Sequence, residues 1–522
     1  MNERRRFLKS LVAVPVLAAG CATTPGRNSA VAPAQPLDEV RPISGAKPAT
    51  TVRPEVISGD RPRHVIHLVA DGMSSGILTA ADHHSQFTRG RGLSWFDLVR
   101  SRLVQPGFMN VRSQNSLVTD SSASSSAWGS GVRIPNGKVN QSSTGGKLAT
   151  LYELLGSSGW KRGLVTTTEI THATPAGFIA CEEKRENGEA IAAQYLERRI
   201  EVALGGGSNH FSKDKRKDKR DLAADFAVAG YAVLRTPTDL ENAPMDRPLL
   251  GIFCGGHLPY LVDQRGDLTK PVATPSLANL TRTALRRLSI HERFILQVEG
   301  GRVDHGGHSN DAASAILEMI GFDEALDVCL EFQREHPDTL LVITTDHATA
   351  NPGLNGLGDN YGKSTSLFHH VSRMRQSTGE IVKRLQLSEN VTQLRARLRE
   401  STGFQATLLQ IELLRPFLRK RGHALFEGLN SEVGALGQVL ANYLGISFTS
   451  TNHTADYVPI LALGPGAERF RGFVENTEVF EHYLDFAGVQ FRNPQERLVV
   501  DASGAVPTEN TEEYWRVEGG DT

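Results

Sequence analysis

Residues 294–308 read FILQVEGGRVDHGGH, an apolar run followed at once by acidic residues, glycines and histidines. The run at 294–298 shows little alternation, which indicates a strand buried on both faces of a parallel sheet. It ends at Glu299, with Asp304 and His308 shortly after. Residues four apart share a helix face, so Asp304 and His308 can hold one metal ion, and carboxylate with imidazole suits zinc. The alternative for this stretch is a solvated loop.

Four further apolar runs end in turn or polar residues, and they complete the fold-class pattern. They span 65–70, 163–168, 340–345 and 458–463. Asp71 follows the first run, His172 lies near the end of the second, and Asp346 with His347 follows the third. Ligands of parallel sheets bind beyond the carboxyl ends of the strands. The pattern therefore predicts an α/β fold with a site at that edge.

Composition narrows the class of protein. The 522 residues carry 57 Lys and Arg against 58 Asp and Glu, a formal charge of −1, so no specific nucleic-acid partner is expected. Hydrophobic residues make up 39% and charged residues 22%, which is typical of a soluble globular protein. The three internal cysteines, Cys181, Cys254 and Cys329, allow at most one disulfide. No apolar run reaches the roughly 18 residues of a spanning helix.

The N-terminus has the pattern of an export signal. Arg4, Arg5 and Arg6 precede an apolar run at 11–19 that ends in small residues. The end of the run, LAAGC, resembles a bacterial lipobox with Cys21 as the lipidated residue; the alternative is an ordinary cysteine beside a conventional cleavage site. We expect twin-arginine export to the periplasm or a lipid anchor at the cell envelope, with membrane contact only through that lipid.

Composition also divides the chain into segments. The export signal occupies 1–21, and 22–60 is rich in Pro, Ala, Thr and Ser, as in a flexible linker. The catalytic domain is expected over 61–490, followed by a polar tail at 491–522. Within the domain, 372–445 is rich in Leu and Arg with helical spacing. We interpret it as a helical insertion that covers or borders the site, with plain packing as its favoured role.

The hydroxyl-rich stretch TDSSASSSAW at 119–128 places Ser121 near a helix start. Free N–H groups and the positive end of the helix dipole make such a start a natural anion site. The alternative is that Ser121 or Ser122 only caps the helix.

In chain order and local context, these residues resemble those of alkaline phosphatases, metal-dependent phosphomonoesterases that form a phosphoserine intermediate. The resemblance covers 62–360 and 450–485, and includes Thr174 in the segment HATPA and His453. It implies a three-layer sandwich around a mainly parallel central sheet. It also implies Ser121 as the nucleophile and Arg185 as the phosphate-binding arginine.

The resemblance further implies two zinc ions and one magnesium ion. The first zinc takes Asp304, His308 and His453; the second takes Asp71, Asp346 and His347; the magnesium takes Asp71, Thr174 and Glu299. Phosphate is expected near His172 and His305, where some family members carry Asp and Lys and others carry His at both; for His305 the alternative is a structural role. An imidazole there is expected to weaken magnesium binding and to admit zinc or another transition metal. The resemblance is compatible with a monomer or a homodimer.

Other readings of the same residues are a phosphodiesterase or another metal-dependent hydrolase of the superfamily. Diesterases usually carry a Thr nucleophile and lack the Thr174 and Glu299 set, and the sulfatase pattern is absent around Ser121. A phosphate- or metal-binding surface protein would have lost a ligand, and none is lost. Hydrolysis of phosphate monoesters outside the cytoplasm is therefore the expected function. The remaining histidines, His257 among them, are expected to be ordinary surface or core residues.

Overall fold

The structure, a computed structural model, describes residues 61–266, 274–356, 358–496 and 498. The expected export signal at 1–21 with Cys21, the linker at 22–60 and most of the tail at 491–522 lie outside the described residues. Among the described residues, no helix has the length and apolar character needed to cross a membrane.

A ten-stranded sheet lies at the centre of the protein, and all five apolar runs of the sequence are strands in it. In spatial order the strands are β14 (Gly472–Glu475), β2 (Gln105–Asn110), β13 (Val458–Leu463), β8 (Thr339–Thr344), β1 (His64–Val69), β7 (Phe294–Glu299), β3 (Lys161–Glu169), β4 (Val202–Gly206), β6 (Leu249–Ile252) and β5 (Ala232–Leu234). Neighbouring strands are parallel, except that β13 runs antiparallel to both β2 and β8. The expected α/β fold with a mainly parallel sheet is confirmed.

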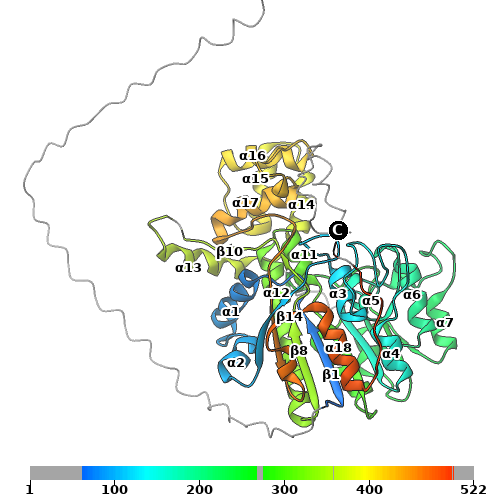
Figure 1. The fold of residues 1–522 in the computed structure, drawn as a ribbon. Helices are drawn as coiled ribbons and strands as arrows, with labels where there is room; N and C mark the ends of the chain where they lie inside the picture. Colours follow the sequence, from blue (N-terminus) through cyan, green and yellow to red (C-terminus); the bar gives the residue numbers. More distant parts are fainter. Residues whose placement is uncertain (1–60, 267–273, 357, 497, 499–522) are drawn as a thin grey trace, which may run out of the picture. The chain divides into compact units, whose positions relative to one another are not determined.

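Helices cover both faces of the sheet and give three layers (Figure 1). Successive side chains of β1 point to opposite faces, so Ile66 and Leu68 join one core while Val65 and Val69 join the other. The first core includes residues of α1 (Ser75–Arg89), α2 (Ser94–Ser101), α8 (Pro237–Glu241), α9 (Leu261–Gly266), α10 (Leu277–Leu288), α11 (Arg302–His308) and α12 (Ala312–Glu335). The second includes residues of α3 (Ser121–Ser130), α4 (Leu151–Ser157), α5 (Ala173–Ile179), α6 (Gly188–Glu197), α7 (Leu222–Val228) and α18 (Asn476–Ala487).

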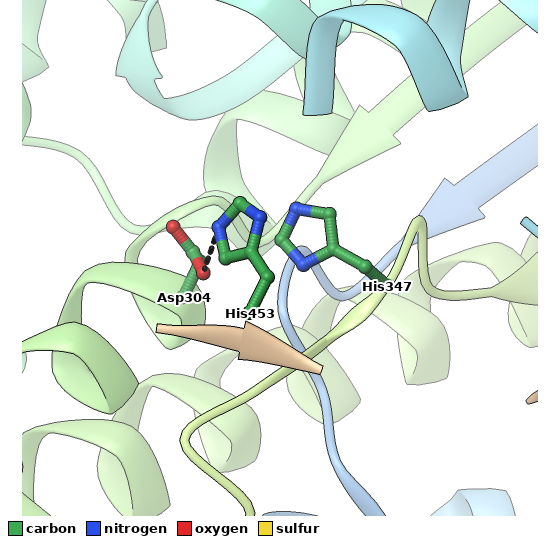
Figure 2. A group of neighbouring side chains, drawn as sticks. All are labelled: Asp304, His347 and His453. Atoms are coloured by element: carbon green, nitrogen blue, oxygen red, sulfur yellow. Dashed lines mark ion pairs between the residues drawn. The ribbon is translucent and has the colours of Figure 1, made fainter. Parts of the chain in front are cut away.

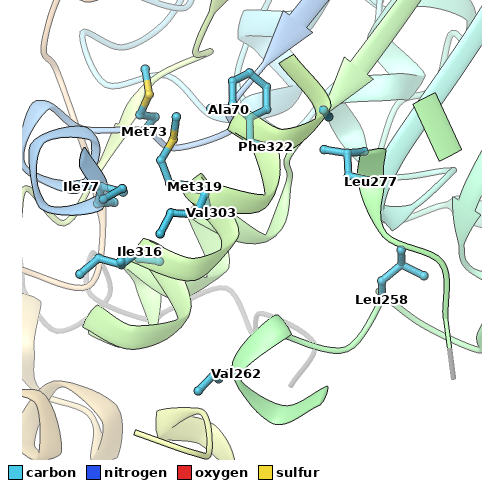
Figure 3. Packing of buried hydrophobic residues seen from close by; sticks show 14 of the residues in the cluster. Ala70, Met73, Ile77, Leu258, Val262, Leu277, Val303, Ile316, Met319 and Phe322 are labelled. Atoms are coloured by element: carbon cyan, nitrogen blue, oxygen red, sulfur yellow. The ribbon is translucent and has the colours of Figure 1, made fainter. Parts of the chain in front are cut away.

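The first core supports the edge of the sheet at which the strands end (Figure 3). Met319 and Phe322 of α12 lie in one buried cluster with Val303 of α11 and Met73, which follows β1. The short helix α11 approaches α12 closely at Gly306, where a Cβ atom would lie 2.7 Å from the backbone nitrogen of Ala315. Glycine at this position therefore lets α11 sit tightly on α12, which fixes the helix that carries Asp304 and His308.

The region interpreted as a helical insertion folds into a group of helices. They are α13 (Gly362–Phe368), α14 (Thr378–Gln386), α15 (Val391–Thr402), α16 (Leu408–Leu418) and α17 (Glu432–Leu444). On α16, Ile411 and Leu414 are buried, whereas Leu408, Leu409 and Leu413 are 60%, 69% and 62% exposed. The leucine spacing thus marks the helix, but only some of these positions face a core.

The remaining elements are two-residue strands and 3₁₀ turns. Two ribbons pair β9 (Ala348–Thr349) with β12 (His453–Thr454) and β10 (Gly353–Leu354) with β11 (Ile446–Ser447). The 3₁₀ turns are η1 (Ser208–His210), η2 (His369–Arg373), η3 (Glu427–Leu429) and η4 (Ala467–Phe470). Cys181, Cys254 and Cys329 are all free thiols, so the one bridge that the sequence allowed is not formed.

Candidate active site

The ends of three adjacent strands bring the acidic residues together. Asp71 follows β1, Glu299 closes β7 and Asp346 follows β8, and these strands lie side by side in the sheet. Gly72 continues from β1 with a φ of +70°, and a Cβ atom there would lie 2.5 Å from Asp304 Oδ1. Only glycine accepts both the left-handed backbone and this close approach. The turn after β1 therefore brings Asp71 close to the helix that carries Asp304.

Four side chains at these strand ends form what we call the buried group: Asp71, Glu299, Asp346 and His347. All four have no exposed surface. His347 Nε2 lies 3.2 Å from Asp346 Oδ2 and 3.6 Å from Asp71 Oδ1. The ligand atoms of Asp71, Asp346 and His347 lie within 4.8 Å of one another, as do those of Asp71, Glu299 and His172. The buried group therefore contributes to two sets of atoms that can each hold a cation, one of them completed by His172, and Asp71 belongs to both.

Hydroxyl groups extend the buried group on both sides. Thr174 Oγ1, on α5, donates to Asp71 Oδ2 over 3.2 Å. Glu299 Oε2 accepts hydrogen bonds from Thr166 and Thr168 of β3. Ser121 Oγ, in the first residue of α3, lies 3.1 Å from His347 Nε2. The hydroxyl of Ser121 therefore faces the point where the ligand atoms converge.

Three further side chains form what we call the rim group: Asp304, His308 and His453. His308 Nε2 lies 3.4 Å from Asp304 Oδ2 and 2.9 Å from His453 Nε2, and His453 Nε2 lies 3.6 Å from Asp304 Oδ1. Figure 2 shows the Asp304–His453 pair beside His347, whose ring stacks on that of His453 at a centroid distance of 3.6 Å. The two groups are therefore in direct contact.

Backbone carbonyls set the tautomers of the rim histidines. His308 Nδ1 lies 2.6 Å from the carbonyl oxygen of Thr451, and His453 Nδ1 lies 2.9 Å from that of Thr119. A carbonyl only accepts, so each Nδ1 carries the proton and each Nε2 offers a lone pair. Such an outer hydrogen bond is the usual way in which a metal-binding histidine is oriented. Two lone pairs 2.9 Å apart, beside a carboxylate, fit a shared cation.

The acid–base properties of the buried group also fit a cation. Burial, followed by the charge of Asp346, raises the pKa of Asp71 well above its ordinary range. Burial raises the pKa of Glu299 to about 7 and that of Asp346 to about 6. Asp71 Oδ1, Glu299 Oε1 and Asp346 Oδ2 are buried without a hydrogen-bond partner. Buried carboxylate oxygens of this kind are stable when they coordinate metal ions, so the donor set fits hard and borderline cations.

Asp304 of the rim group behaves in the opposite way. Burial alone would raise its pKa, but the imidazoles of His308 and His453 hold it well below its ordinary range. Thr349 Oγ1 also donates to Asp304 Oδ1. The carboxylate of the rim group therefore receives a hydrogen bond from the protein itself.

The phosphate-binding arginine expected from the sequence lies beside the nucleophile helix. Arg185 Nη1 lies 3.1 Å from Asp120 Oδ2, and its Nη2 lies 3.3 Å from His172 Nε2. Asp120 is the N-cap of α3, because its Oδ1 accepts from the N–H of Ala123 over 2.8 Å. The idea that Ser121 or Ser122 caps the helix is therefore wrong, and Ser121 is left free to face the buried group.

Three imidazoles form one side of the site, which we call the histidine wall: His172, His257 and His305. Their ring centroids lie 4.6–5.5 Å apart, and each pair meets edge to face. His257, expected from the sequence to be an ordinary surface or core residue, lies against both of the other rings. It lies in the loop after β6, in the segment CGGH, where Cys254 is the one metal-type neighbour in sequence and no acidic residue is adjacent.

Comparison with known proteins decides the family. The sequence profile described as alkaline phosphatase matches residues 62–489. The chain belongs to the alkaline phosphatase family. It is 28% identical over 428 residues to alkaline phosphatase 4 of Bacillus subtilis, covering 80% of this chain and 87% of that one. It is 30% identical over 469 residues to streptomycin-6-phosphate phosphatase of Streptomyces griseus, covering 81% and 90%.

A solved structure agrees with this assignment. The crystal structure of Thermus thermophilus alkaline phosphatase superposes with a TM-score of 0.79 at 33% identity, and covers 85% of this chain and 95% of that one. Membership of the family makes this protein a phosphomonoesterase with metal-binding side chains at the ends of its central strands.

Proposed function

We propose that the protein hydrolyses phosphate monoesters through a phosphorylated Ser121, with two zinc ions and one magnesium ion. The observation that carries this proposal is the position of Ser121 Oγ, 3.1 Å from His347 Nε2 and at the open end of α3. A free serine hydroxyl among unpartnered carboxylate oxygens and imidazole lone pairs has the surroundings of a nucleophile.

Each metal ion has a defined set of side chains in this proposal. Asp304, His308 and His453 hold the first zinc; Asp71, Asp346 and His347 hold the second; Asp71, Thr174 and Glu299 hold the magnesium, next to His172. When bound, the ions supply the positive charge that a phosphoryl group and its attacking and leaving oxygens need during in-line displacement. Nitrogen-containing sets suit zinc, and the all-oxygen set suits magnesium.

Residues of the chain bind the phosphate group and carry out the displacement at phosphorus. Arg185 directs its planar fork at two non-bridging phosphoryl oxygens, and Asp120 holds the guanidinium in place. The free N–H groups at the start of α3 face the same anion. Ser121 Oγ then bonds to phosphorus while the ester P–O bond breaks and the alcohol leaves with a proton. Water hydrolyses the phosphoserine, which releases phosphate and restores the hydroxyl of Ser121.

Hydrolysis of p-nitrophenyl phosphate tests this proposal. The protein is stripped with a chelator, and zinc and magnesium are then restored separately and together. We expect turnover to return only with metal and to be lost in Ser121→Ala. Ser130→Ala is the matched control, because Ser130 ends the same helix and its hydroxyl bonds only to the carbonyl of Ser126. Full activity of Ser121→Ala would contradict the phosphoserine route.

We also propose that the protein acts outside the cytoplasm, which rests on the N-terminal sequence alone. Replacing Arg4 and Arg5 by Lys should retain the protein in the cytoplasm, as cell fractionation would detect. Labelling with a fatty acid should mark the wild-type chain and not Cys21→Ala. A wild-type chain that stays in the cytoplasm would contradict the export proposal, whereas unlabelled but exported protein would contradict only the lipid anchor.

A further inference from the structure

His257 is held in place from two sides by backbone atoms. The loop before it is bonded to η1: Gly207 N donates to Gly256 O over 2.8 Å, and Ser208 N donates to Cys254 O over 2.8 Å. On the ring itself, Nδ1 accepts from the N–H of Glu169, at the end of β3, over 3.1 Å. The imidazole of His257 is therefore fixed in position and in orientation.

The fixed ring contacts both of the other imidazoles of the histidine wall. Its centroid lies 4.6 Å from that of His305 at an interplanar angle of 60°, and 5.5 Å from that of His172 at 85°. His172 and His305 also meet edge to face, at 5.5 Å and 86°. Aromatic rings favour this geometry. His257 thus restricts the orientations open to both neighbours.

Each ring of the histidine wall carries its proton on one nitrogen. A guanidinium only donates, so His305 Nδ1 accepts from Arg302 Nη1 over 2.6 Å, and His172 Nε2 accepts from Arg185 Nη2 over 3.3 Å. His305 and His257 therefore carry Nε2–H, and His172 carries Nδ1–H.

We propose that His257 is a positioning residue of the phosphatase reaction, which holds His172 and His305 so that Arg185 and the His305 Nε2–H group address bound phosphate. His172 connects the position of His257 to the phosphate site. It contacts Arg185, and its possible ligand atom lies within 4.8 Å of those of Asp71 and Glu299. Among the described residues, no hydrogen bond occupies the Nε2 atom of His305 or of His257. This inference rests on the phosphate-binding role proposed for Arg185.

Three substitutions separate the ring of His257 from its nitrogen atoms. His257→Phe keeps an aromatic ring and loses both nitrogens. His257→Asn keeps an acceptor for the Glu169 N–H group and loses the ring, and His257→Ala loses both features. The matched control is His370→Asn, which alters a histidine of η2 that contacts the carbonyl of Tyr443, away from the site.

The first measurement is the inhibition constant of inorganic phosphate for the metal-loaded enzyme, with metal content measured in parallel. Substitution of outer residues that orient a site typically changes the affinity or activity of that site by about tenfold or more. We expect the constant to rise by about that factor in His257→Asn and His257→Ala, while His257→Phe and the control stay near the wild-type value. Metal content and melting temperature should not change in any of the four.

The second measurement is the nitrogen-15 spectrum of the imidazoles, which reports tautomers without any turnover. In the wild type and in His257→Phe, His305 should show a protonated Nε2 and an unprotonated Nδ1. In His257→Ala the His305 signals should move toward a mixture of the two tautomers.

The outcomes separate the positioning role from its alternatives. If His257→Phe is as impaired as His257→Ala, the nitrogen atoms of His257 and not its ring contacts carry the effect, and positioning through ring packing is wrong. If all variants match the wild type in both measurements, His257 has no role in the site. A wild type that does not hydrolyse monoesters would contradict the function instead, and the tautomer measurement would still decide whether His257 orders its neighbours.

Discussion

The buried group and the rim group are in contact, yet they differ in exposure, in hydrogen bonding and in the direction in which the pKa values of their carboxyl groups are shifted. The side chains of Asp346 and His347 have no exposed surface, whereas those of His308 and His453 are 35% and 15% exposed. In the buried group three carboxylate oxygens have no partner, and burial raises their pKa values. In the rim group the histidines are oriented by carbonyls and the pKa of Asp304 is lowered.

This difference shows where metal binding and folding are coupled. The histidines of the rim group are oriented by hydrogen bonds to backbone carbonyls, which do not depend on a cation. The buried group concentrates negative charge in a dry site, which destabilises the metal-free fold. Cations that bind only the folded state should therefore stabilise the protein mainly through the buried group.

The largest expected effect comes from Asp71→Asn, which removes the carboxylate shared by both cation sets of the buried group. Metal ions contribute several kcal/mol to transition-state stabilisation, so kcat/KM should fall by about 10³-fold or more. The melting temperature of the metal-free protein should rise, because one crowded charge is gone. An equally large loss of metal-free stability would contradict the difference between the two groups.

The pH dependence of metal-free stability comes next. A raised pKa means that the folded state binds more protons than the unfolded state between the ordinary and the raised value. That window runs from 3.8 to about 6 for Asp346 and from 4.5 to about 7 for Glu299. The contribution of these groups to the free energy of unfolding should therefore fall as pH rises from 4 to 7 in chelator-treated protein. Denaturant titrations with and without zinc and magnesium would measure it; Asp71→Asn should reduce the fall.

His308→Asn should have a smaller effect, because it changes a partly exposed residue of the rim group. We expect one zinc equivalent to bind about 10- to 100-fold more weakly, with little change in metal-free stability. Competition with a coloured chelator would give the affinity, and the melting temperature would give the stability. A collapse of metal-free stability would show that the rim group is not arranged independently.

Thr349→Val should have the smallest effect of the four. It removes one hydroxyl that donates to Asp304 and keeps the shape of the side chain. A hydrogen bond to a charged group contributes about 1.5–3 kcal/mol, so stability should fall by no more than that amount. Urea unfolding of the metal-free protein would detect the change, and no change at all would mean that Asp304 is satisfied by its histidines alone.

The sequence could predict which acidic side chains meet at the strand ends, because apolar runs that stop at Asp71, Glu299 and Asp346 place these side chains on one edge of a parallel sheet. It could also place Asp304 and His308 one helical turn apart. The N-cap of α3 was harder to predict, because Asp120, Ser121 and Ser122 all suit that role. Only tertiary contacts select Asp120.

Other features depend on contacts between distant segments. His257 follows a short strand with no motif, and its importance comes only from rings that belong to other loops. The antiparallel direction of β13 depends on how the chain returns from the helices at 360–445, which periodicity does not record. The same holds for α16, where spacing alone does not separate the buried Ile411 from the exposed Leu409.

The most direct test of the proposed chemistry is to trap the phosphorylated enzyme. The metal-loaded protein is mixed with a phosphate monoester, quenched in acid during turnover and mapped by mass spectrometry. We expect one phosphoryl group, carried by Ser121 and absent from Ser121→Ala. A phosphoryl group on another residue, or an enzyme that turns over without becoming phosphorylated, would contradict the role assigned to Ser121.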